Sequence, residues 1–334
     1  MNIIALIITV FIADMTSGPE QRSGDAKNIV TAEELREWVS YLASDEMSGR
    51  RNGSPEMKVA AQWIAARFNE YGLHSIGGKD NLYQEYTAAT RQGTINERNV
   101  IGIIEGSDPV LRNQYLVVSA HFDHIGVRKG NPQDSICNGA DDNASGTCTL
   151  IGIAKYLMVS KAAPKRTIIF AAFSGEEGGM RGSRNFVSVA TVPVKSIIAD
   201  INFEMIGHTD FLGKKKYYMT GCQNSNIDDL IREFDKNTDI TLIDTIPVAE
   251  QLFYSSDNIA FSRISTAEGK TIGIPSGTFA TSTSGPYLHS VDDEIGLFDF
   301  QNMADLVNYF GKMVLFLADT DSQIKWTSPK FARP

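Results

Sequence analysis

The sequence predicts an α/β fold. Three apolar, β-branched runs at 100–104, 115–119 and 167–173 alternate with helical patterns at 146–158 and around 182–189, and such alternation is typical of strands joined by crossover helices. A fourth run at 196–203 continues the series. No repeat with a period of roughly 20 to 50 residues and no Pro- or Ser-rich linker divides the chain, so we expect one domain over 30–334, without an inserted accessory domain.

The amino-terminal residues have the pattern of an export signal. The apolar run from Ile3 to Ile12 is too short to span a bilayer, but it has the length of a signal-peptide core. We predict a signal peptide over 1–18, a flexible polar leader over 19–29, and a secreted or periplasmic protein; the alternative is a buried first strand. Later apolar runs fall short of the roughly 18 residues of a spanning helix, so we expect no stable membrane insertion after signal removal.

Two helices are expected before the first strand, and one closes the chain. Thr31 followed by Glu34 is a capping-box signature that opens the first helix. Ser54 and Pro55 place a cap and an N1 proline before the second, whose apolar residues recur with the helical period. An amphipathic pattern over 300–317 suits the closing helix.

The net charge and the cysteine content argue against some classes of function. The formal net charge is -9, whereas nucleic-acid binders concentrate Lys and Arg on basic faces, so we expect no nucleic-acid partner. The three cysteines, Cys137, Cys148 and Cys222, match neither a zinc knuckle nor a redox CxxC pair. They are expected to be small buried residues; a disulfide between two of them is the alternative if the chain is exported.

The first candidate site residues follow the run at 115–119. His121 and Asp123 fall at the carboxyl end of this expected strand, where open α/β sheets bind their ligands. If strand geometry continues, both side chains point the same way, and the carboxylate can orient the imidazole toward a metal. A histidine with a purely structural role is the alternative.

Two acidic pairs come next. Asp141 and Asp142 lie among small residues immediately before a helical pattern, where an aspartate can cap the helix or bridge two cations. Glu176 and Glu177 follow the strand 167–173. Because adjacent side chains diverge, one glutamate can bind metal while its neighbour faces the substrate as a general base. Two solvated surface glutamates are the alternative.

Two further candidates lie later in the chain. Glu204 is an acid inside an otherwise apolar, strand-like segment, a placement that costs free energy unless the charge is compensated, as a metal would do. His289 lies in a loop rich in Ser, Thr, Gly and Pro and would be unremarkable alone.

Taken in order, these segments resemble the M28 family of zinc exopeptidases, the group of bacterial aminopeptidases. The resemblance begins at 42–50, LASDEMSGR, and runs to the closing helix after His289, so it covers most of the chain. It implies a three-layer α/β/α sandwich around a central mixed, mostly parallel sheet.

The resemblance also implies two zinc ions and a role for each candidate. Asp142, and not Asp141, would bridge the metals, and a cis peptide is implied after it. Glu176 matches the general base, and Asp123 matches the carboxylate behind the metal-bound histidine. One metal would take His121 and Glu204, and the other Glu177 and His289.

Two positions depart from the family pattern. The family more often has Asp where this chain has Glu204, which could change the coordination or the preferred metal. In the loop 253–258, Asn258 replaces a histidine, and Tyr254 is a candidate for steadying the oxyanion, with Phe253 as the alternative occupant of that place.

The function implied is a metal-dependent exopeptidase, a zinc aminopeptidase acting on peptides with a free amino terminus. Two zinc ions would polarise the scissile carbonyl and activate a water, and Glu176 would take its proton and return it to the leaving amine. The alternatives are a glutaminyl-peptide cyclase-like acyltransferase with one zinc, a non-catalytic relative, and an exopeptidase acting at the other terminus.

Overall fold

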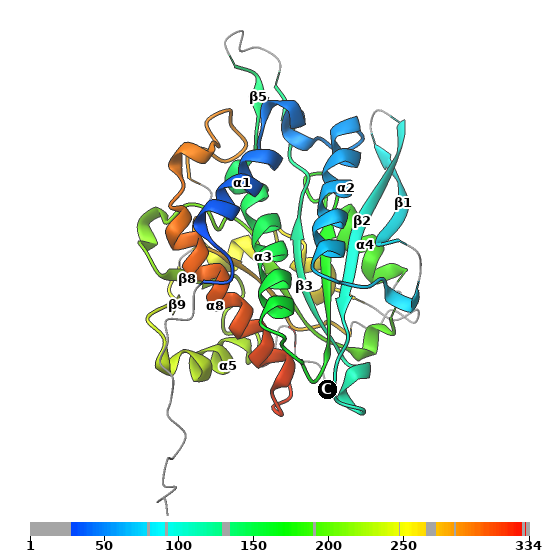
Figure 1. Cartoon of the computed structure of the whole chain (residues 1–334), viewed down its shortest axis with the longest axis vertical. Helices are drawn as coiled ribbons and strands as arrows, with labels where there is room; N and C mark the ends of the chain where they lie inside the picture. The colour runs from blue at the N-terminus through cyan, green and yellow to red at the C-terminus, as the bar shows by residue number, and fades with distance from the viewer. Residues whose placement is uncertain are drawn as a thin grey trace, which may run out of the picture.

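A mixed sheet of eight strands forms the middle layer of the molecule (Figure 1). The computed structural model describes residues 28–78, 81–90, 93–128, 134–189, 192–246, 248–264, 272–283, 285–328 and 331. The strand order is β1-β2-β6-β3-β7-β10-β8-β9. The bounds are Tyr83–Thr90 (β1), Gly93–Ile104 (β2), Tyr115–His121 (β3), Thr167–Phe173 (β6), Ile197–Phe203 (β7), Lys216–Met219 (β8), Thr241–Ile243 (β9) and Ser276–Ala280 (β10).

The centre of the sheet is parallel and its margins are mixed. Strands β6, β3, β7 and β10 run parallel to one another, and β8 pairs in parallel with β9. The pairs β1·β2, β2·β6 and β10·β8 are antiparallel. Two short strands, β4 (Gly126–Val127) and β5 (Ile136–Cys137), pair outside the main sheet.

Helices cover both faces of the sheet (Figure 1). On one face lie α1 (Ala32–Leu42), α2 (Pro55–Glu70), α3 (Gly146–Val159), α5 (Ile227–Phe234) and α8 (Phe300–Asp319), which share a single apolar core with the strands. On the other face lie α4 (Arg181–Ser188) and α7 (Asn258–Ser262). The short helix α6 (Ala249–Leu252) packs near β8 and β10. The expected three-layer sandwich around a mixed, mostly parallel sheet is confirmed.

The central strands are recognisable in the sequence because both of their faces are buried. In β6, Ile168 and Phe170 pack into the core under α3 and α8, whereas Ile169 and Phe173 pack into the core under α4 and α7. Successive side chains of a strand point to opposite faces, so a strand covered on both sides reads as a continuous apolar run.

The expected helices form close to their predicted bounds. In α1 the capping box is complete, because Thr31 Oγ1 accepts a hydrogen bond from the Glu34 amide at 3.2 Å and the Thr31 amide donates to Glu34 Oε2 at 3.1 Å. Helix α2 begins at Pro55 as predicted, but the Ser54 hydroxyl makes no capping hydrogen bond. The predicted start of α2 is therefore confirmed, whereas the predicted capping hydrogen bond of Ser54 is absent.

The outer strands of the sheet were not predicted from the sequence. Strand β1 lies at the edge of the sheet, and its residues alternate between half-buried and exposed, so polar and charged side chains break the apolar run. Strands β8, β9 and β10 have only four, three and five residues, which is too short for a period of two to be visible.

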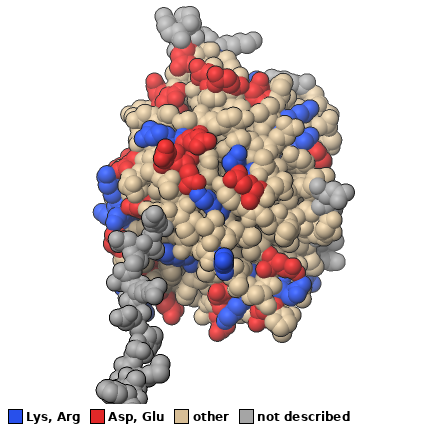
Figure 2. All heavy atoms as spheres, viewed as in Figure 1, with Lys and Arg blue, Asp and Glu red and all other residues tan. Residues whose placement is uncertain are grey.

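Several expectations concern the termini, surface and cysteines. The predicted signal peptide and residues 19–27 of the leader lie outside the described residues. Within the described part of the chain, none of the helices combines the length and apolar character that crossing a bilayer requires. None of the three cysteines forms a disulfide; Cys137 and Cys148 are buried as expected, whereas Cys222 is half-buried. On the face in Figure 2, Lys and Arg are interspersed with Asp and Glu, with no broad basic area.

Candidate metal centre

The predicted metal donors lie together at the carboxyl edge of the parallel strands. His121 ends β3, Glu177 lies shortly after β6, and Glu204 follows β7 directly. Asp142 lies in the turn that leads into α3, and His289 lies in the loop after β10. Since parallel strands place their carboxyl ends at one edge of the sheet, donors that are distant in sequence meet there.

The five side chains form two groups that share Asp142. In the first, His121 Nε2 lies 3.4 Å from Asp142 Oδ1 and 3.2 Å from Glu204 Oε1. In the second, His289 Nε2 lies 3.2 Å from Asp142 Oδ2 and 3.0 Å from Glu177 Oε1. The two oxygens of Asp142 thus face different groups, as a bridging ligand requires.

These separations suit zinc. Ligands at about 2.0 to 2.1 Å from a tetrahedral zinc lie about 3.3 to 3.4 Å from one another, and the four separations run from 3.0 to 3.4 Å. Imidazole nitrogens and carboxylate oxygens are zinc ligands. Glu177 Oε1 is buried and makes no hydrogen bond to any of the described residues, and a buried charged oxygen of this kind needs a cation or donor to compensate it.

A network around Asp141 shapes the turn that carries Asp142. The Asp293 carboxylate accepts the Asp141 amide at 2.8 Å and the Asp142 amide at 3.1 Å. The Asp141 carboxylate accepts the Gly207 amide at 2.8 Å and the Ser282 hydroxyl at 2.8 Å. The side chain of Asp141 is therefore engaged in joining neighbouring loops, and that of Asp142 lies among the donors.

Asn143 ties this turn to two strand ends. The peptide between Asp142 and Asn143 is cis, as the resemblance implies. Asn143 Nδ2 donates to the carbonyl of His121 at 3.2 Å and to that of Phe203 at 3.0 Å. The ends of β3 and β7 are thereby held at fixed positions relative to the start of α3.

The geometry at Asp123 differs from the expected one. His121 Nδ1 lies 3.1 Å from the backbone carbonyl of Asp123 but 3.7 Å from its carboxylate. The carboxylate instead accepts the amides of Glu176 at 3.0 Å and Glu177 at 3.1 Å, and Asn52 Nδ2 at 2.6 Å. The reason is that β3 ends at His121, so strand alternation does not extend to Asp123.

Glu176 precedes the donor Glu177 in the chain and lies in the cleft that the donors line, among them His121 and Glu204. Burial raises the pKa of Glu176 well above its ordinary value, and the neighbouring acids Glu204 and Asp257 raise it further. A carboxylate with a raised pKa is a stronger base, which suits a group that accepts a proton.

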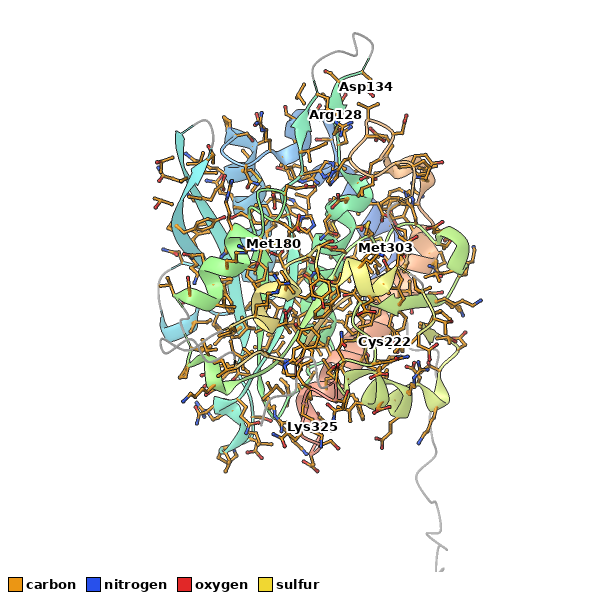
Figure 3. The ribbon with its side chains drawn as sticks, turned by 180° about the vertical axis from the view of Figure 1, so that it is seen from behind. Arg128, Asp134, Met180, Cys222, Met303 and Lys325 are labelled. Carbon is orange, nitrogen blue, oxygen red and sulfur yellow. The ribbon has the colours of Figure 1, made fainter. Side chains whose placement is uncertain are left out.

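The cleft beside the donors has a volume of about 420 Å³, within the range of small-molecule sites. Its apolar wall includes Met180, Met205, Leu252 and Leu288; Met180 is labelled in Figure 3. Met180, Met205 and His289 have positive φ values of 55°, 49° and 54°. Backbone strain of this kind in non-glycine residues clusters at functional sites.

Tyr254, the predicted oxyanion residue, does not line this cleft. The guanidinium of Arg263 lies over its ring at 5.4 Å, and the alternative residue, Phe253, is fully buried. The aromatic hydroxyl among the lining residues belongs to Tyr218, and it donates to the carbonyl of Ser282 at 2.7 Å.

Sequence reasoning missed His124, which lies inside the second donor group. Its Nδ1 is 3.1 Å from Glu177 Oε1 and 3.5 Å from Asp142 Oδ2. With Asp142, Glu177 and His289 it forms a set of four potential metal ligands whose donor atoms all lie within 4.8 Å of one another. The signal in the sequence is the recurrence of histidine three residues after His121, just past the end of the strand.

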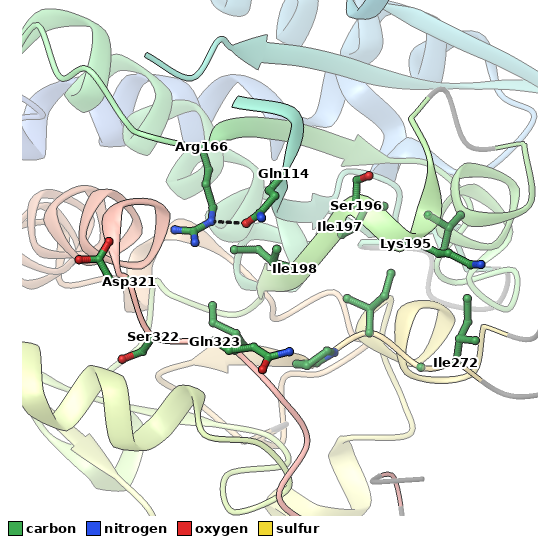
Figure 4. A pocket seen from close by; sticks show the side chains of 15 residues that line it. Gln114, Arg166, Lys195, Ser196, Ile197, Ile198, Ile272, Asp321, Ser322 and Gln323 are labelled. Atoms are coloured by element: carbon green, nitrogen blue, oxygen red, sulfur yellow. Dashed lines mark hydrogen bonds between the residues drawn. The ribbon is translucent and has the colours of Figure 1, made fainter. Parts of the chain in front are cut away.

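A larger cavity of about 690 Å³ lies at the opposite edge of the sheet (Figure 4). It is lined by residues that precede the parallel strands, such as Gln114 and Arg166. Arg166 donates to Gln114 Oε1 at 2.8 Å and to the carbonyls of Ala318 and Thr320 at 3.1 and 2.6 Å. Its guanidinium is therefore used within the protein, and the described residues that line the cavity include no cluster like that of the metal centre.

An α/β/α sandwich with two groups of zinc-type donors and an adjacent glutamate at the strand ends defines a metallopeptidase. The model of peptidase family M28 matches residues 99–312, a span that includes all five predicted donors and Glu176. The chain belongs to peptidase family M28.

Individual relatives agree with this assignment. A probable leucine aminopeptidase of Trichophyton verrucosum is 26% identical over 283 residues, covering 81% of this chain and 68% of that protein. A zinc aminopeptidase from Bacillus subtilis has a similar structure, with a TM-score of 0.65, 16% identity and coverage of 87% of this chain and 96% of that one. A glutaminyl cyclase from Porphyromonas gingivalis is similar too, with a TM-score of 0.61, 18% identity and coverage of 87% and 98%. The structural likenesses show the fold alone.

Proposed function

We propose that the protein is a two-zinc aminopeptidase that releases amino-terminal residues from peptides. The observation that carries the proposal is the pair of donor groups on the two oxygens of Asp142, with Glu176 in the adjoining cleft. The first group would hold one zinc through His121, Asp142 and Glu204, and the second would hold another through Asp142, Glu177 and His289.

The metal and the protein have separate tasks in this proposal. Zinc supplies Lewis-acid polarisation of the scissile carbonyl and makes water a nucleophile at neutral pH. Glu176 accepts the proton of the attacking water and gives it to the leaving amine, acting as base and then as acid. Asp123 keeps Glu176 and Glu177 in their orientations, since its carboxylate accepts both of their amides.

The cleft supports a preference for a free amino terminus next to an aliphatic side chain. The carboxylates of Asp142, Glu177 and Glu204 in its lining would be taken up by the zinc ions, whose charge offsets theirs. The carboxylate left to attract a cationic α-amine is that of Glu176. The apolar wall of methionine and leucine side chains suits a residue of leucine size. This agrees with the name of the Trichophyton verrucosum relative, a probable leucine aminopeptidase.

The test is a panel of aminoacyl-p-nitroanilides with their amino-terminally acetylated counterparts, with zinc measured in the same preparation. We expect hydrolysis of leucine-p-nitroanilide, no hydrolysis of the acetylated compound, and about two zinc equivalents per chain. Equal hydrolysis of the free and acetylated compounds would exclude aminopeptidase action.

The same preparation tests the cyclase alternative. The likeness to a glutaminyl cyclase has a TM-score close to that of the aminopeptidase, so the fold does not separate the two activities. The intact donor groups on both sides of Asp142 favour the peptidase. One zinc per chain, with cyclisation of peptides that begin with glutamine, would establish the cyclase instead.

A further inference from the structure

The two donor groups are unequal, and His124 is the residue that distinguishes them. Its side chain is buried, with the whole residue only 1% exposed. Neither ring nitrogen makes a hydrogen bond within the described part of the chain. Nδ1 nevertheless lies 3.1 Å from Glu177 Oε1 and 3.5 Å from Asp142 Oδ2. A buried imidazole without hydrogen bonds, directed at two carboxylates, indicates a metal ligand.

Four of the six separations among the four donor atoms suit one zinc, and all six are within 4.8 Å. His289 Nε2 is 3.0 Å from Glu177 Oε1 and 3.2 Å from Asp142 Oδ2. Together with the two contacts of His124, these separations run from 3.0 to 3.5 Å and bracket the edge of about 3.3 Å expected for a tetrahedral zinc site.

The structure holds the ring of His124 in this place. A Cβ on Gly139 would come within 2.5 Å of the ring, so a side chain at that position could not be accommodated without a shift, and Gly139 also has a φ of 61°. His289 packs edge-on against the ring, with 5.5 Å between centroids. The backbone amide of His124 donates to the carbonyl of Arg50 at 3.2 Å.

Among the residues that the structure describes, the first group has no fourth donor of this kind. Donors of both groups line the cleft, namely His121, Asp142, Glu204, Glu177 and His289, whereas His124 does not. The metal held by the first group would therefore keep a position open toward the cleft. Structural zinc sites have four protein ligands, and catalytic sites have three and an open position.

We propose that His124 is a sixth metal ligand that closes the second site, and that the open, substrate-facing metal position belongs to His121, Asp142 and Glu204. This rests on the proposed binding of two zinc ions but not on the peptide that is cleaved. Four protein ligands predict tighter binding than three, so the first zinc equivalent would fill the closed site.

The experiment is a zinc titration of the metal-free, full-length protein against a chromophoric chelator, followed by the same titration of H124Q. The wild-type chain should show a tighter and a weaker event. H124Q should weaken the tighter event by about 100-fold or more, because even changes behind a ligand cost 10- to 100-fold. The weaker event should change little. An unchanged tighter event in folded H124Q would overturn the proposal.

Two matched variants accompany H124Q. H121Q should weaken only the other event, because His121 belongs to the open group. H74Q replaces an exposed histidine far along the chain from all of the donors, and it should leave both events as in the wild type. Loss of the tighter event in H74Q as well would show that the effect of H124Q is not specific.

Cobalt gives a readout that needs no variant. The first equivalent of Co²⁺ added to the metal-free wild-type chain should produce the intense visible bands of a four-coordinate site. Weak bands typical of five or six ligands would contradict the closed site. A wild-type chain that binds only one zinc would refute the two-zinc function, whereas two zinc ions unaffected by H124Q would refute only the role of His124.

Discussion

Glu176 and Glu177 are adjacent in the chain but have different surroundings. Glu177 Oε1 lies 3.0 Å from His289 Nε2 and 3.1 Å from His124 Nδ1. Glu176 lies in the cleft, where burial raises its pKa. The carboxylate of Asp123 accepts both of their backbone amides. These hydrogen bonds hold the turn after β6 in a conformation in which the two side chains point in different directions.

The first prediction concerns Glu176 itself. E176Q keeps the size of the side chain but removes its basicity, so kcat should fall by about 10²- to 10⁴-fold, while the zinc content stays at the wild-type level. Steady-state hydrolysis of leucine-p-nitroanilide and elemental analysis measure the two quantities. E85Q, on the exposed side of β1, is the control. A fall in zinc content equal to the fall in kcat would mean that Glu176 is a ligand and not the base.

A second prediction at this scale concerns the support of Glu204. The Ser256 hydroxyl donates to Glu204 Oε1 and also accepts from Asn202 Nδ2 at 2.7 Å. S256A should weaken zinc binding by the first donor group by about 10- to 100-fold, since partners behind ligands orient them. S256T keeps the hydroxyl and should restore most of the affinity. If S256A and the wild type bind both zinc ions equally, Ser256 does not orient Glu204.

At the scale of elements, the amino-terminal segment 31–50 joins the helical layer to the metal centre. Helix α1 packs against α3 and α8. At the end of the segment, Arg50 is fully buried and donates to the backbone carbonyls of Leu42, Phe122, Asn138 and Gly139. Burial lowers the pKa of Arg50 to about 10, so the guanidinium is still charged at neutral pH.

Loss of the capping box of α1 is predicted to lower stability and to leave activity unchanged. T31A removes the acceptor for the Glu34 amide and should lower the free energy of unfolding by about 1 kcal/mol. Urea unfolding followed by circular dichroism measures this change. T31S keeps the hydroxyl and should be close to the wild type. A loss of zinc in T31A would show that the cap acts on the metal centre, contrary to expectation.

Removal of the buried guanidinium of Arg50 is predicted to cause a larger loss of stability. R50M removes the guanidinium donors from four buried carbonyls, of which that of Gly139 still accepts the Ala144 amide. Each buried carbonyl left without a donor costs about 1 to 3 kcal/mol. The free energy of unfolding should fall by at least about 3 kcal/mol, and R50K should recover only part of it, because an ammonium has fewer donors. Wild-type stability of R50M in urea would contradict the role given to these hydrogen bonds.

For the whole molecule, the metal centre joins strands that are far apart in sequence. Removing zinc should therefore destabilise the folded chain. A ligand present at 100 times its Kd stabilises the folded state by about 2.7 kcal/mol, so chelation should lower Tm by several degrees and added zinc should restore it. Differential scanning calorimetry with and without chelator measures the change. An unchanged Tm, with zinc removal verified by elemental analysis, would show that zinc binding does not contribute to the global stability of the chain.

The sequence predicted the parts of the fold whose signals are local. The central strands were recognisable because both faces are buried, and α1 because its capping box is local to four residues. The donor types and their order were also visible, since His121, Glu177 and Glu204 each follow an apolar run. The edge and short strands were not, because their pairing depends on neighbours that are distant in the chain.

The sequence by itself determined the layer architecture, the family and the chemistry of the donors. Only the tertiary structure decided how the donors divide around Asp142, that His124 joins the second group, and that the Asp123 carboxylate serves the glutamate amides and not the His121 ring. The physical reason is that local patterns fix backbone conformation, whereas side-chain direction beyond a strand end depends on the turns packed against it. Distances between donors depend on the order of the strands in the sheet.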